Sequence, residues 1–483
     1  MQLIVKIFPE IIIKSKTVRQ RLVKQLRNNI RRLLKPIASG IDVVGSWDRI
    51  TIHAPTLNEA QQAEVIDILK RTPGIHHFLR VDTYTFETLD DIINIVCPIY
   101  ANQITGKTFC VRAKRAGRHP FKSGDIERAV GAALYAAGKP KGVSLTEPEV
   151  QVTLEIKDQK LHIVGARYEG LGGYPLGGQE SCLSLISGGF DSTVSSFLMM
   201  KRGVRTHFCF FNLGGLAHEV GVKQVAHYLW SRYGASQRVH FISVPFADVV
   251  GEILTKVHHS YMGVILKRCM VRAAASLAKR WDIPGLVTGE SIAQVSSQTM
   301  INLSVIDQAT PALILRPLAC WDKEQIIRMA REIGTEDFAK TMPEYCGVIS
   351  DRPHTAAKLE DVLAEEAKMD MHLLDEAVAK AQVTPIDQVM ESVKTLHDVT
   401  IVATPQKDDV IIDVRHPDEQ EAKPLHLTNN QVLSIPFYEL GRKFPELDHS
   451  RRYLLYCDRG VMSQMQAVEL KEKGHDNVLV YRP

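Results

Sequence analysis

Residues 183–192 read Leu-Ser-Leu-Ile-Ser-Gly-Gly-Phe-Asp-Ser, and this stretch decides how the central part of the chain folds. Its apolar start is typical of a buried parallel strand. The two glycines let the backbone approach a ligand closely and adopt positive φ. Ser192 and Thr193 open a helical pattern, and the free N–H groups and dipole of a helix start attract an anion. The stretch therefore predicts a strand, a phosphate-binding loop and a helix, although two glycines alone would also suit an ordinary β-turn-α junction.

Alternating strand and helix patterns continue beyond this stretch and predict a doubly wound parallel sheet. The expected strands are 206–212, 238–244 and 285–288, and the expected helices are 193–202, 219–233, 247–256 and 267–279. In such a sheet the ligand lies at the carboxyl ends of the strands, which is where the glycine loop falls. Asp191, a carboxylate inside a phosphate-binding loop, suits a Mg²⁺ ligand.

Three further stretches are expected to complete this site. Lys267 and Arg268 supply cations that could neutralise phosphates, although they could equally be a surface pair. Residues 287–291, Val-Thr-Gly-Glu-Ser, end a strand in a turn that allows close approach to an adenine or ribose. Residues 294–299, Gln-Val-Ser-Ser-Gln-Thr, are a polar cluster beside it.

The motif Ser-Gly-Gly-x-Asp-Ser resembles the PP-loop of ATP pyrophosphatases. Together with Ser-Tyr-Met-Gly-Val-Ile-Leu-Lys-Arg at 260–268 and the two stretches above, it resembles the ThiI family of 4-thiouridine synthetases. The resemblance implies that ATP, with Mg²⁺, adenylates O4 of a tRNA uridine and that sulfur then displaces AMP. It implies a catalytic role for Asp191 and ATP binding by Leu185, Ile186, Ser187, Gly188, Gly189, Ser192, Lys267, Gly289 and Gln298.

The N-terminal third carries two basic segments without acidic residues. Between Ile11 and Pro36 there are nine Lys or Arg residues, with apolar residues at helical spacing. Solvated helix faces usually mix both signs of charge, so this amphipathic helix favours a polyanion such as nucleic acid. Gly106–Lys122 predicts a strand with a basic edge. The residues expected to contact RNA are Lys14, Arg19, Arg27, Arg112, Lys114, Arg115 and Arg118.

Strand patterns at 43–53 and 76–86 and a helix at 57–71 complete a βαββαβ order, which predicts a ferredoxin-like domain. The segment 76–167 resembles a THUMP domain, an RNA-binding module of tRNA-modifying enzymes, through Phe109–Arg112 and the strand pair 150–157 and 160–168. Residues 101–108 match a relaxed Walker A pattern, but a basic strand follows them instead of a helix, so no phosphate loop is expected there. Gly170–Gly178 holds five glycines and predicts a flexible linker or substrate-side loop.

The eight cysteines are scattered and contain no C-x-x-C pair. This argues against zinc ribbons and Cys-rich iron–sulfur sites, and it excludes 2-thiouridine enzymes of the C-x-x-C type. Cys97 and Cys110 carry no signature. The cysteines at 182, 209, 269 and 320 lie in or beside apolar runs and are expected to be packing residues.

Cys457 follows the strand pattern 452–456 and precedes a helix at 464–473. A cysteine beside inward-pointing N–H groups near a helix start is expected to have a lowered pKa and can carry a persulfide. With Ile412–Arg415 and Ser434–Pro436, this loop resembles a rhodanese domain, which opens after an acidic helical stretch at 356–393. The resemblance implies that a cysteine desulfurase loads Cys457 with sulfur and that Cys346 resolves it through a transient Cys346–Cys457 disulfide, which a reductant opens.

The predicted architecture is therefore α/β and multidomain. A ferredoxin-like domain covers 1–75, a THUMP domain 76–167, a doubly wound PP-loop ATP pyrophosphatase domain 168–400 and a rhodanese domain 401–483. No apolar run approaches the ~18 residues of a membrane span and no signal peptide is evident, so a cytoplasmic protein without membrane partners is expected. Neither a structural metal nor a tightly bound organic cofactor is expected. The family also supplies sulfur to a small carrier protein for thiamine's thiazole.

Two other functions would use parts of the same sequence. An ATP-dependent ligase of the amidotransferase type would need an ammonia source, and no glutaminase domain is evident. A non-catalytic RNA-binding scaffold would have no need for the intact Ser187, Gly188, Gly189, Asp191 and Ser192.

Overall fold

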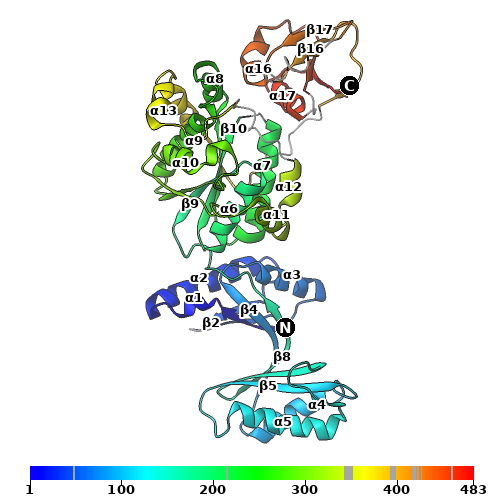
Figure 1. The fold of residues 1–483 in the computed structure, drawn as a ribbon. Helices are drawn as coiled ribbons and strands as arrows, with labels where there is room; N and C mark the ends of the chain where they lie inside the picture. Colours follow the sequence, from blue (N-terminus) through cyan, green and yellow to red (C-terminus); the bar gives the residue numbers. More distant parts are fainter. Residues whose placement is uncertain are drawn as a thin grey trace. The chain divides into compact units, whose positions relative to one another are not determined.

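The computed structural model describes residues 1–46, 49–213, 216–341, 352–391, 399–415, 420, 424–425, 427–457 and 461–483. They belong to two compact units, Met1–Gly178 and Gln179–Pro483 (Figure 1). Within these described ranges, no helix combines the length and apolar character needed to cross a membrane.

The first unit is built on one eight-stranded sheet with the order β2-β3-β1-β4-β8-β7-β5-β6. Its long central strand β4 (Ile75–Thr85) pairs with β1 on one side and with β8 on the other. The remaining strands are β1 (Gln2–Ile7), β2 (Asp42–Gly45), β3 (Arg49–His53), β5 (Thr108–Ala116), β6 (Gly142–Val143), β7 (Val150–Lys157) and β8 (Lys160–Glu169). The ferredoxin-like and THUMP parts therefore share a continuous sheet.

Two pairs of longer helices cover this sheet (Figure 1). After the short α1 (Pro9–Ile12), α2 (Lys16–Leu34) and α3 (Glu59–Lys70) pack on the ferredoxin-like part, and α4 (Leu89–Tyr100) and α5 (Ser123–Gly138) pack on the THUMP part. The predicted amphipathic helix is confirmed, because α2 buries Leu22, Leu26, Ile30 and Leu34. Residues 101–107 form turns between α4 and β5, which confirms that the Walker-like match is not a phosphate loop.

Two expectations for this unit are wrong. The predicted strand 43–53 is two antiparallel strands, β2 and β3. Gly170–Gly178, expected to be a flexible linker or a substrate-side loop, does end at the boundary of the two units, but the expected flexibility is wrong, because Tyr174 and Leu176 are buried in the core. The carbonyl oxygen of Leu176 accepts hydrogen bonds from Gln25 at 3.0 Å and Asn29 at 2.8 Å. The glycines allow this close approach, and the two apolar side chains between them hold it.

The second unit begins with a six-stranded sheet in the order β13-β12-β9-β10-β11-β14. Its strands are β9 (Ser181–Leu185), β10 (Arg205–Asn212), β11 (His240–Pro245), β12 (Gly285–Val287), β13 (Leu313–Leu315) and β14 (Gln382–Pro385). The predicted parallel strands are confirmed as β9, β10, β11 and β12, and β13, which the sequence did not predict, adds a fifth parallel strand beside β12. β14 pairs antiparallel with β11 and lies inside the stretch expected to be helical at 356–393, so that expectation is wrong in part.

Helices surround this sheet and position its loops. They are α6 (Phe190–Lys201), α7 (Leu216–Leu229), α8 (Ala247–Lys256), α9 (Met262–Arg280), α10 (Met300–Asp307), α11 (Lys323–Glu332), α12 (Glu336–Thr341), α13 (Leu359–Glu366) and α14 (His372–Ala379). The core between sheet and helices is formed largely by α8, α9 and the strands β10 and β11.

The C-terminal part holds a second, five-stranded parallel sheet in the order β15-β19-β18-β16-β17. The strands are β15 (Ile401–Val402), β16 (Val410–Asp413), β17 (Gln431–Ser434), β18 (Tyr453–Tyr456) and β19 (Val478–Tyr481), with helices α16 (Phe437–Lys443) and α17 (Val461–Glu472). Buried apolar residues of β16, β18 and β19 form its core.

Candidate active site

The predicted strand, loop and helix around Gly188 are confirmed. β9 ends at Leu185 and α6 begins at Phe190. Gly188 has a φ of +83°, which favours glycine. The hydroxyl of Ser192 accepts a hydrogen bond from the backbone N–H of Ser187 at 3.1 Å, so the first turn of α6 holds the loop in place.

A cavity of about 480 Å³ lies at this carboxyl edge of the sheet, a size typical of small-ligand pockets. Part of its wall is apolar, with Phe210, Phe211 and Met270. The predicted site residues that line it are Leu185, Ile186, Ser187, Gly189, Asp191, Ser192, Lys267, Gly289 and Gln298. Gly188 belongs to the same loop but not to the wall. The structure thus brings an apolar surface and a phosphate-binding loop into one cavity.

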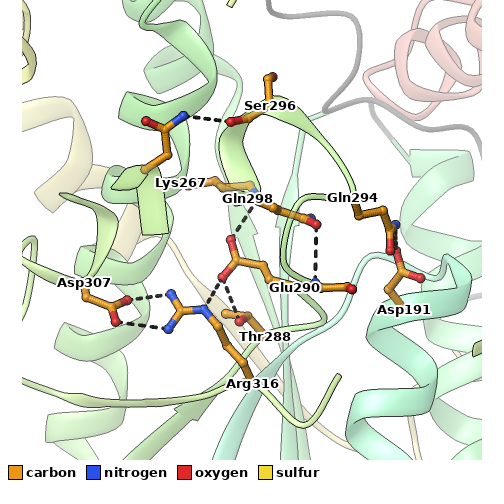
Figure 2. A network of polar contacts seen from close by, with 11 residues as sticks. Asp191, Lys267, Thr288, Glu290, Gln294, Ser296, Gln298, Asp307 and Arg316 are labelled. Carbon is orange, nitrogen blue, oxygen red and sulfur yellow. Dashed lines mark hydrogen bonds and ion pairs between the residues drawn. The ribbon is translucent and has the colours of Figure 1, made fainter. Parts of the chain in front are cut away.

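A buried acid organises the cations on one side of the cavity (Figure 2). Glu290, just after β12, accepts from the Lys267 ammonium at 2.8 Å and from the Arg316 guanidinium at 2.8 Å. Thr288 donates to the same carboxylate at 3.0 Å, and Arg316 also pairs with Asp307. Burial alone would raise the pKa of the Glu290 carboxyl, but Lys267 and Arg316 outweigh burial and hold that pKa below its usual value.

Lys323 is a site residue that the sequence did not single out. It is the first residue of α11, its ammonium lies 2.9 Å from the Asp191 carboxylate, and it also lines the cavity. Gln294 donates to the other oxygen of Asp191 at 2.8 Å. The signal available in the sequence was Asp322, whose side chain caps α11 and so places Lys323 in its first turn.

The donor set is compatible with Mg²⁺ that arrives with a phosphate ligand. Within the described residues, no three His, Cys, Asp or Glu side chains gather into a metal site. Protein-bound Mg²⁺ commonly takes one or two carboxylates, with substrate phosphates and water as its other ligands. Asp191 supplies one such carboxylate in the cavity.

Gly289 has a steric role at this edge. A Cβ atom at this position would lie 2.7 Å from the carbonyl carbon of Asp191 and 2.7 Å from the amide nitrogen of Ser192. The absence of a side chain therefore lets the end of β12 pack directly on the backbone of the phosphate-binding loop.

Arg268 does not face the cavity. Its side chain is 2% exposed and its guanidinium pairs with Glu366 of α13 at 2.6 Å. The expectation that it could neutralise phosphates is therefore wrong, because Arg268 points away from the cavity into the core.

Cys457 follows β18 directly and is buried. Its sulfur lies 3.3 Å from the backbone N–H of Ser463, which donates to it from the first turn of α17, and 3.4 Å from the Ser463 hydroxyl. These donors stand where the sequence predicted N–H groups from a helix start. Cys346, the predicted resolving cysteine, lies outside the described residues.

The other cysteines divide by burial. Cys182 and Cys269 are buried packing residues as predicted, and burial raises the pKa of each thiol to about 12. Cys209 is also buried, and burial raises its pKa further. Cys320 is exposed, so its assignment as a packing residue is wrong. It ends an apolar run, but the chain turns there before α11 begins.

The predicted RNA-contacting residues all belong to the first unit and none is buried. Lys14, Arg112, Lys114 and Arg118 are exposed, and Arg19, Arg27 and Arg115 are half-buried. The Arg112 guanidinium donates to the carbonyl oxygen of Leu145 at 2.6 Å, and Arg115 donates to that of Gly117 at 2.7 Å. Each of these two guanidinium groups therefore already makes a hydrogen bond within the chain.

Four family models match consecutive parts of the chain. They describe a ThiI ferredoxin-like domain at residues 2–78, a THUMP domain at 86–164, a thiamine biosynthesis protein (ThiI) at 177–371 and a rhodanese-like domain at 399–482. The first two matches cover the two parts of the shared eight-stranded sheet, the third covers β9 to β13 of the six-stranded sheet, and the fourth covers the five-stranded sheet.

Relatives and solved structures agree with these matches. The tRNA sulfurtransferase of Marinobacter nauticus is 52% identical over the whole of both chains, and that of Edwardsiella ictaluri is 53% identical over the same share. A solved 4-thiouridine synthetase–RNA complex with bound ATP has a TM-score of 0.69 and 24% identity, over 80% of this chain and 99% of that one. PH1313 from Pyrococcus horikoshii Ot3 has a TM-score of 0.52 and 19% identity, over 69% and 100%. The chain belongs to the ThiI family of tRNA sulfurtransferases.

Proposed function

We propose that this chain uses ATP to convert a tRNA uridine to 4-thiouridine. The observation that carries the proposal is the cavity, in which the glycine loop, Asp191, Lys267 and Lys323 meet at one edge of the sheet. The full-length relatives named tRNA sulfurtransferase support the same activity. Because tRNA is the substrate, the cytoplasm is the proposed site of action.

In this proposal ATP binds with its base against the apolar wall and its phosphates against the loop. Backbone N–H groups at the start of α6 favour the phosphate charge. Lys267 and Lys323 lie on the cavity wall and offset further negative charge. Asp191 would help to hold Mg²⁺, which neutralises phosphate charge when it is bound.

The activation step joins uridine O4 to the α-phosphorus of ATP. O4 attacks, the bond to the β-phosphate oxygen breaks, pyrophosphate leaves and the N3 proton is lost. AMP then occupies O4 as a leaving group. Lys267, whose side chain is 18% exposed, suits this step because fixed cations are most effective where charge develops in a site shielded from water.

The sulfur step uses the C-terminal sheet. A cysteine desulfurase forms a persulfide on Cys457, where Ser463 donates to the sulfur. Either the terminal sulfur attacks C4 and AMP leaves, or sulfide released from Cys457 attacks instead. In both routes the Cys346 thiolate attacks Sγ of Cys457, the S–S bond breaks and a Cys346–Cys457 disulfide forms. An external dithiol reductant then restores both thiols.

The neighbours of Cys346 support its role. Ala339 of α12 and Pro353, which flank the undescribed residues 342–351, both line the ATP cavity. Described residues on both sides of the segment that contains Cys346 thus lie at the wall of the cavity in which the uridine would be activated.

The basic residues of the first unit are the proposed contact with tRNA. Lys14, Arg112, Lys114 and Arg118 are exposed and suit phosphate contacts, which position a nucleic acid without reading its sequence. Such contacts predict that tRNA affinity falls steeply as salt concentration rises.

The test is reconstitution with the full chain, tRNA lacking the modification, ATP, Mg²⁺, cysteine, a cysteine desulfurase and a dithiol reductant. Nucleoside mass spectrometry is expected to detect 4-thiouridine only with ATP present. Cys457→Ala should abolish sulfur labelling and product but keep ATP binding, whereas Asp191→Ala should keep sulfur labelling and tRNA binding but lose product. Formation of an amidated nucleoside, or tRNA binding without any ATP-dependent product, would contradict the proposal.

We also propose that the Cys457 persulfide supplies sulfur to the carrier protein of thiamine thiazole synthesis. The family model named for thiamine biosynthesis, which matches residues 177–371, favours this second role. A strain lacking the protein should then require thiazole, and the Cys457→Ala chain should not restore growth. Growth without thiazole in the deletion strain would contradict this role.

A further inference from the structure

His218, in the first turn of α7, is a buried titratable residue that the chemistry above does not use. Its side chain is 4% exposed and lines the cavity. Its Nε2 atom lies 3.0 Å from the carbonyl oxygen of Ser187, in the phosphate-binding loop. The ring meets Phe210 edge-on, with 4.9 Å between centroids and 89° between planes. The imidazole is therefore held between the strand β10 and the loop.

The carbonyl oxygen of Ser187 determines which ring nitrogen of His218 carries the proton. A carbonyl oxygen can only accept, so Nε2 must be the donor. Burial lowers the pKa of His218 to about 4, so the ring is neutral at neutral pH. A neutral imidazole donates a hydrogen bond but adds no net charge beside the phosphates.

The structure shows one orientation of the peptide between Ser187 and Gly188, with the Ser187 carbonyl turned towards His218, and a glycine at 188 would also permit another. Gly188 has positive φ and no Cβ, so rotation of this peptide meets little steric resistance. In one orientation the carbonyl oxygen turns towards α7, and in the other it presents its partial negative charge elsewhere in the loop. Because the peptide is planar and trans, the N–H of Gly188 always points opposite to that oxygen.

We propose that His218 is a positioning residue for the phosphates of ATP, which holds the Ser187 carbonyl against α7. The bond keeps a carbonyl dipole away from the phosphates and selects one orientation of the glycine loop. The inference deepens the proposed function, because it takes ATP as the ligand of this loop.

The test compares ATP with adenosine, which has no phosphates, by calorimetric binding to the full-length chain. His218→Phe keeps a planar ring beside Phe210 but removes the donor, and His218→Gln keeps an amide donor of similar reach. For His218→Phe we expect ATP affinity to fall about tenfold or more, which is the effect of one lost hydrogen bond to a buried group. Adenosine affinity should change much less, and His218→Gln should recover most of the ATP affinity.

Equal losses of ATP and adenosine affinity in His218→Phe would overturn the proposal, since they would indicate a general collapse of the cavity. Native ATP affinity in His218→Phe would also overturn it. If His218→Phe does not fold, His218→Leu, which also lacks a donor, replaces it: a selective loss of ATP affinity that His218→Gln does not show would support the proposal, and native ATP affinity in His218→Leu would overturn it. If the native chain binds ATP but forms no 4-thiouridine, the proposed function fails while the binding comparison still decides the role of His218.

Discussion

Lys267 and Arg268 are neighbours on α9, yet they serve two different regions of the molecule. Lys267 lines the cavity and pairs with Glu290, and its side chain is 18% exposed. Arg268 is buried on another face of the helix, pairs with Glu366 and donates to the carbonyl oxygen of Val305. Successive residues of an α-helix are about 100° apart around its axis, so adjacent cations readily reach separate surroundings.

The two acids differ in what surrounds them. Glu366 is enclosed by Arg268 and Arg272 and ties α13 to α9. Glu290 is also buried, but one of its two cations stands on the cavity wall. A phosphate in the cavity can therefore compete with Glu290 for Lys267 while Arg316 still compensates the carboxylate. The Glu366 cluster stabilises the fold, whereas the Glu290 cluster can respond to a ligand.

The largest expected effect follows from breaking the Glu366 cluster. Arg268→Ala leaves Glu366 buried with a weaker partner, and removal of one member of a buried ion pair costs about 3–5 kcal/mol. We expect the free energy of unfolding of the second unit to fall by that amount, measured by urea denaturation. The matched control is Arg272→Ala, whose side chain is 30% exposed and whose contact with Glu366 is 3.2 Å. A larger loss for Arg272→Ala than for Arg268→Ala would reverse this assignment.

In the Glu290 cluster, loss of a cation should weaken ATP binding more than it lowers stability. Lys267→Met keeps most of the side-chain volume and removes the charge. We expect the free energy of unfolding to fall by less than in Arg268→Ala, because Arg316 still pairs with Glu290 at 2.8 Å, shorter than the 3.2 Å contact that Arg272 keeps with Glu366. ATP affinity should fall about 10- to 100-fold, since charge-assisted hydrogen bonds to phosphate contribute about 1.5–3 kcal/mol. Equilibrium binding of ATP measures the first effect and urea denaturation the second. Unaltered ATP affinity would remove Lys267 from the phosphate site.

Local sequence patterns predict the elements of this site, but they do not predict which distant side chains meet in it. The strand, glycine loop and helix at 183–192 follow from local patterns, as do the parallel strands β9, β10, β11 and β12 and the basic face of α2. The separate directions of Lys267 and Arg268 do not, because their partners Glu290 and Glu366 lie 23 and 98 residues away along the chain. Lys323 reaches Asp191 across 132 residues for the same reason. The glycine content of Gly170–Gly178 also led to a wrong prediction of flexibility, because the buried side chains of Tyr174 and Leu176 anchor this segment.

Substitution of Gly289 tests whether the end of β12, which carries Glu290, must pack directly on the phosphate-binding loop. In Gly289→Ala the new Cβ would lie 2.7 Å from backbone atoms of Asp191 and Ser192, so one segment must shift. Such overpacking costs about 1–3 kcal/mol, and here it should appear as weaker ATP binding together with reduced stability. The control is Gly251→Ala on α8, where a Cβ meets no atom within 4 Å. Equal behaviour of the two variants in thermal unfolding and ATP binding would contradict the steric argument.

The smallest expected effect is a pH dependence of the Glu290 cluster. Burial raises the pKa of Glu290, but Lys267 and Arg316 outweigh burial, so the folded state holds this pKa below its usual value. A carboxyl with a lowered folded-state pKa adds stability that is complete above the unfolded-state pKa and is lost as the pH falls through the folded-state pKa. The difference in unfolding free energy between the native chain and Glu290→Gln should therefore be constant from pH 7 to about pH 5 and shrink below about pH 4.5. Glu64→Gln, at an exposed position of α3, provides the control, and its difference from the native chain should stay near zero throughout. A Glu290→Gln difference that grows as the pH falls would show that burial, and not the two cations, dominates this carboxylate.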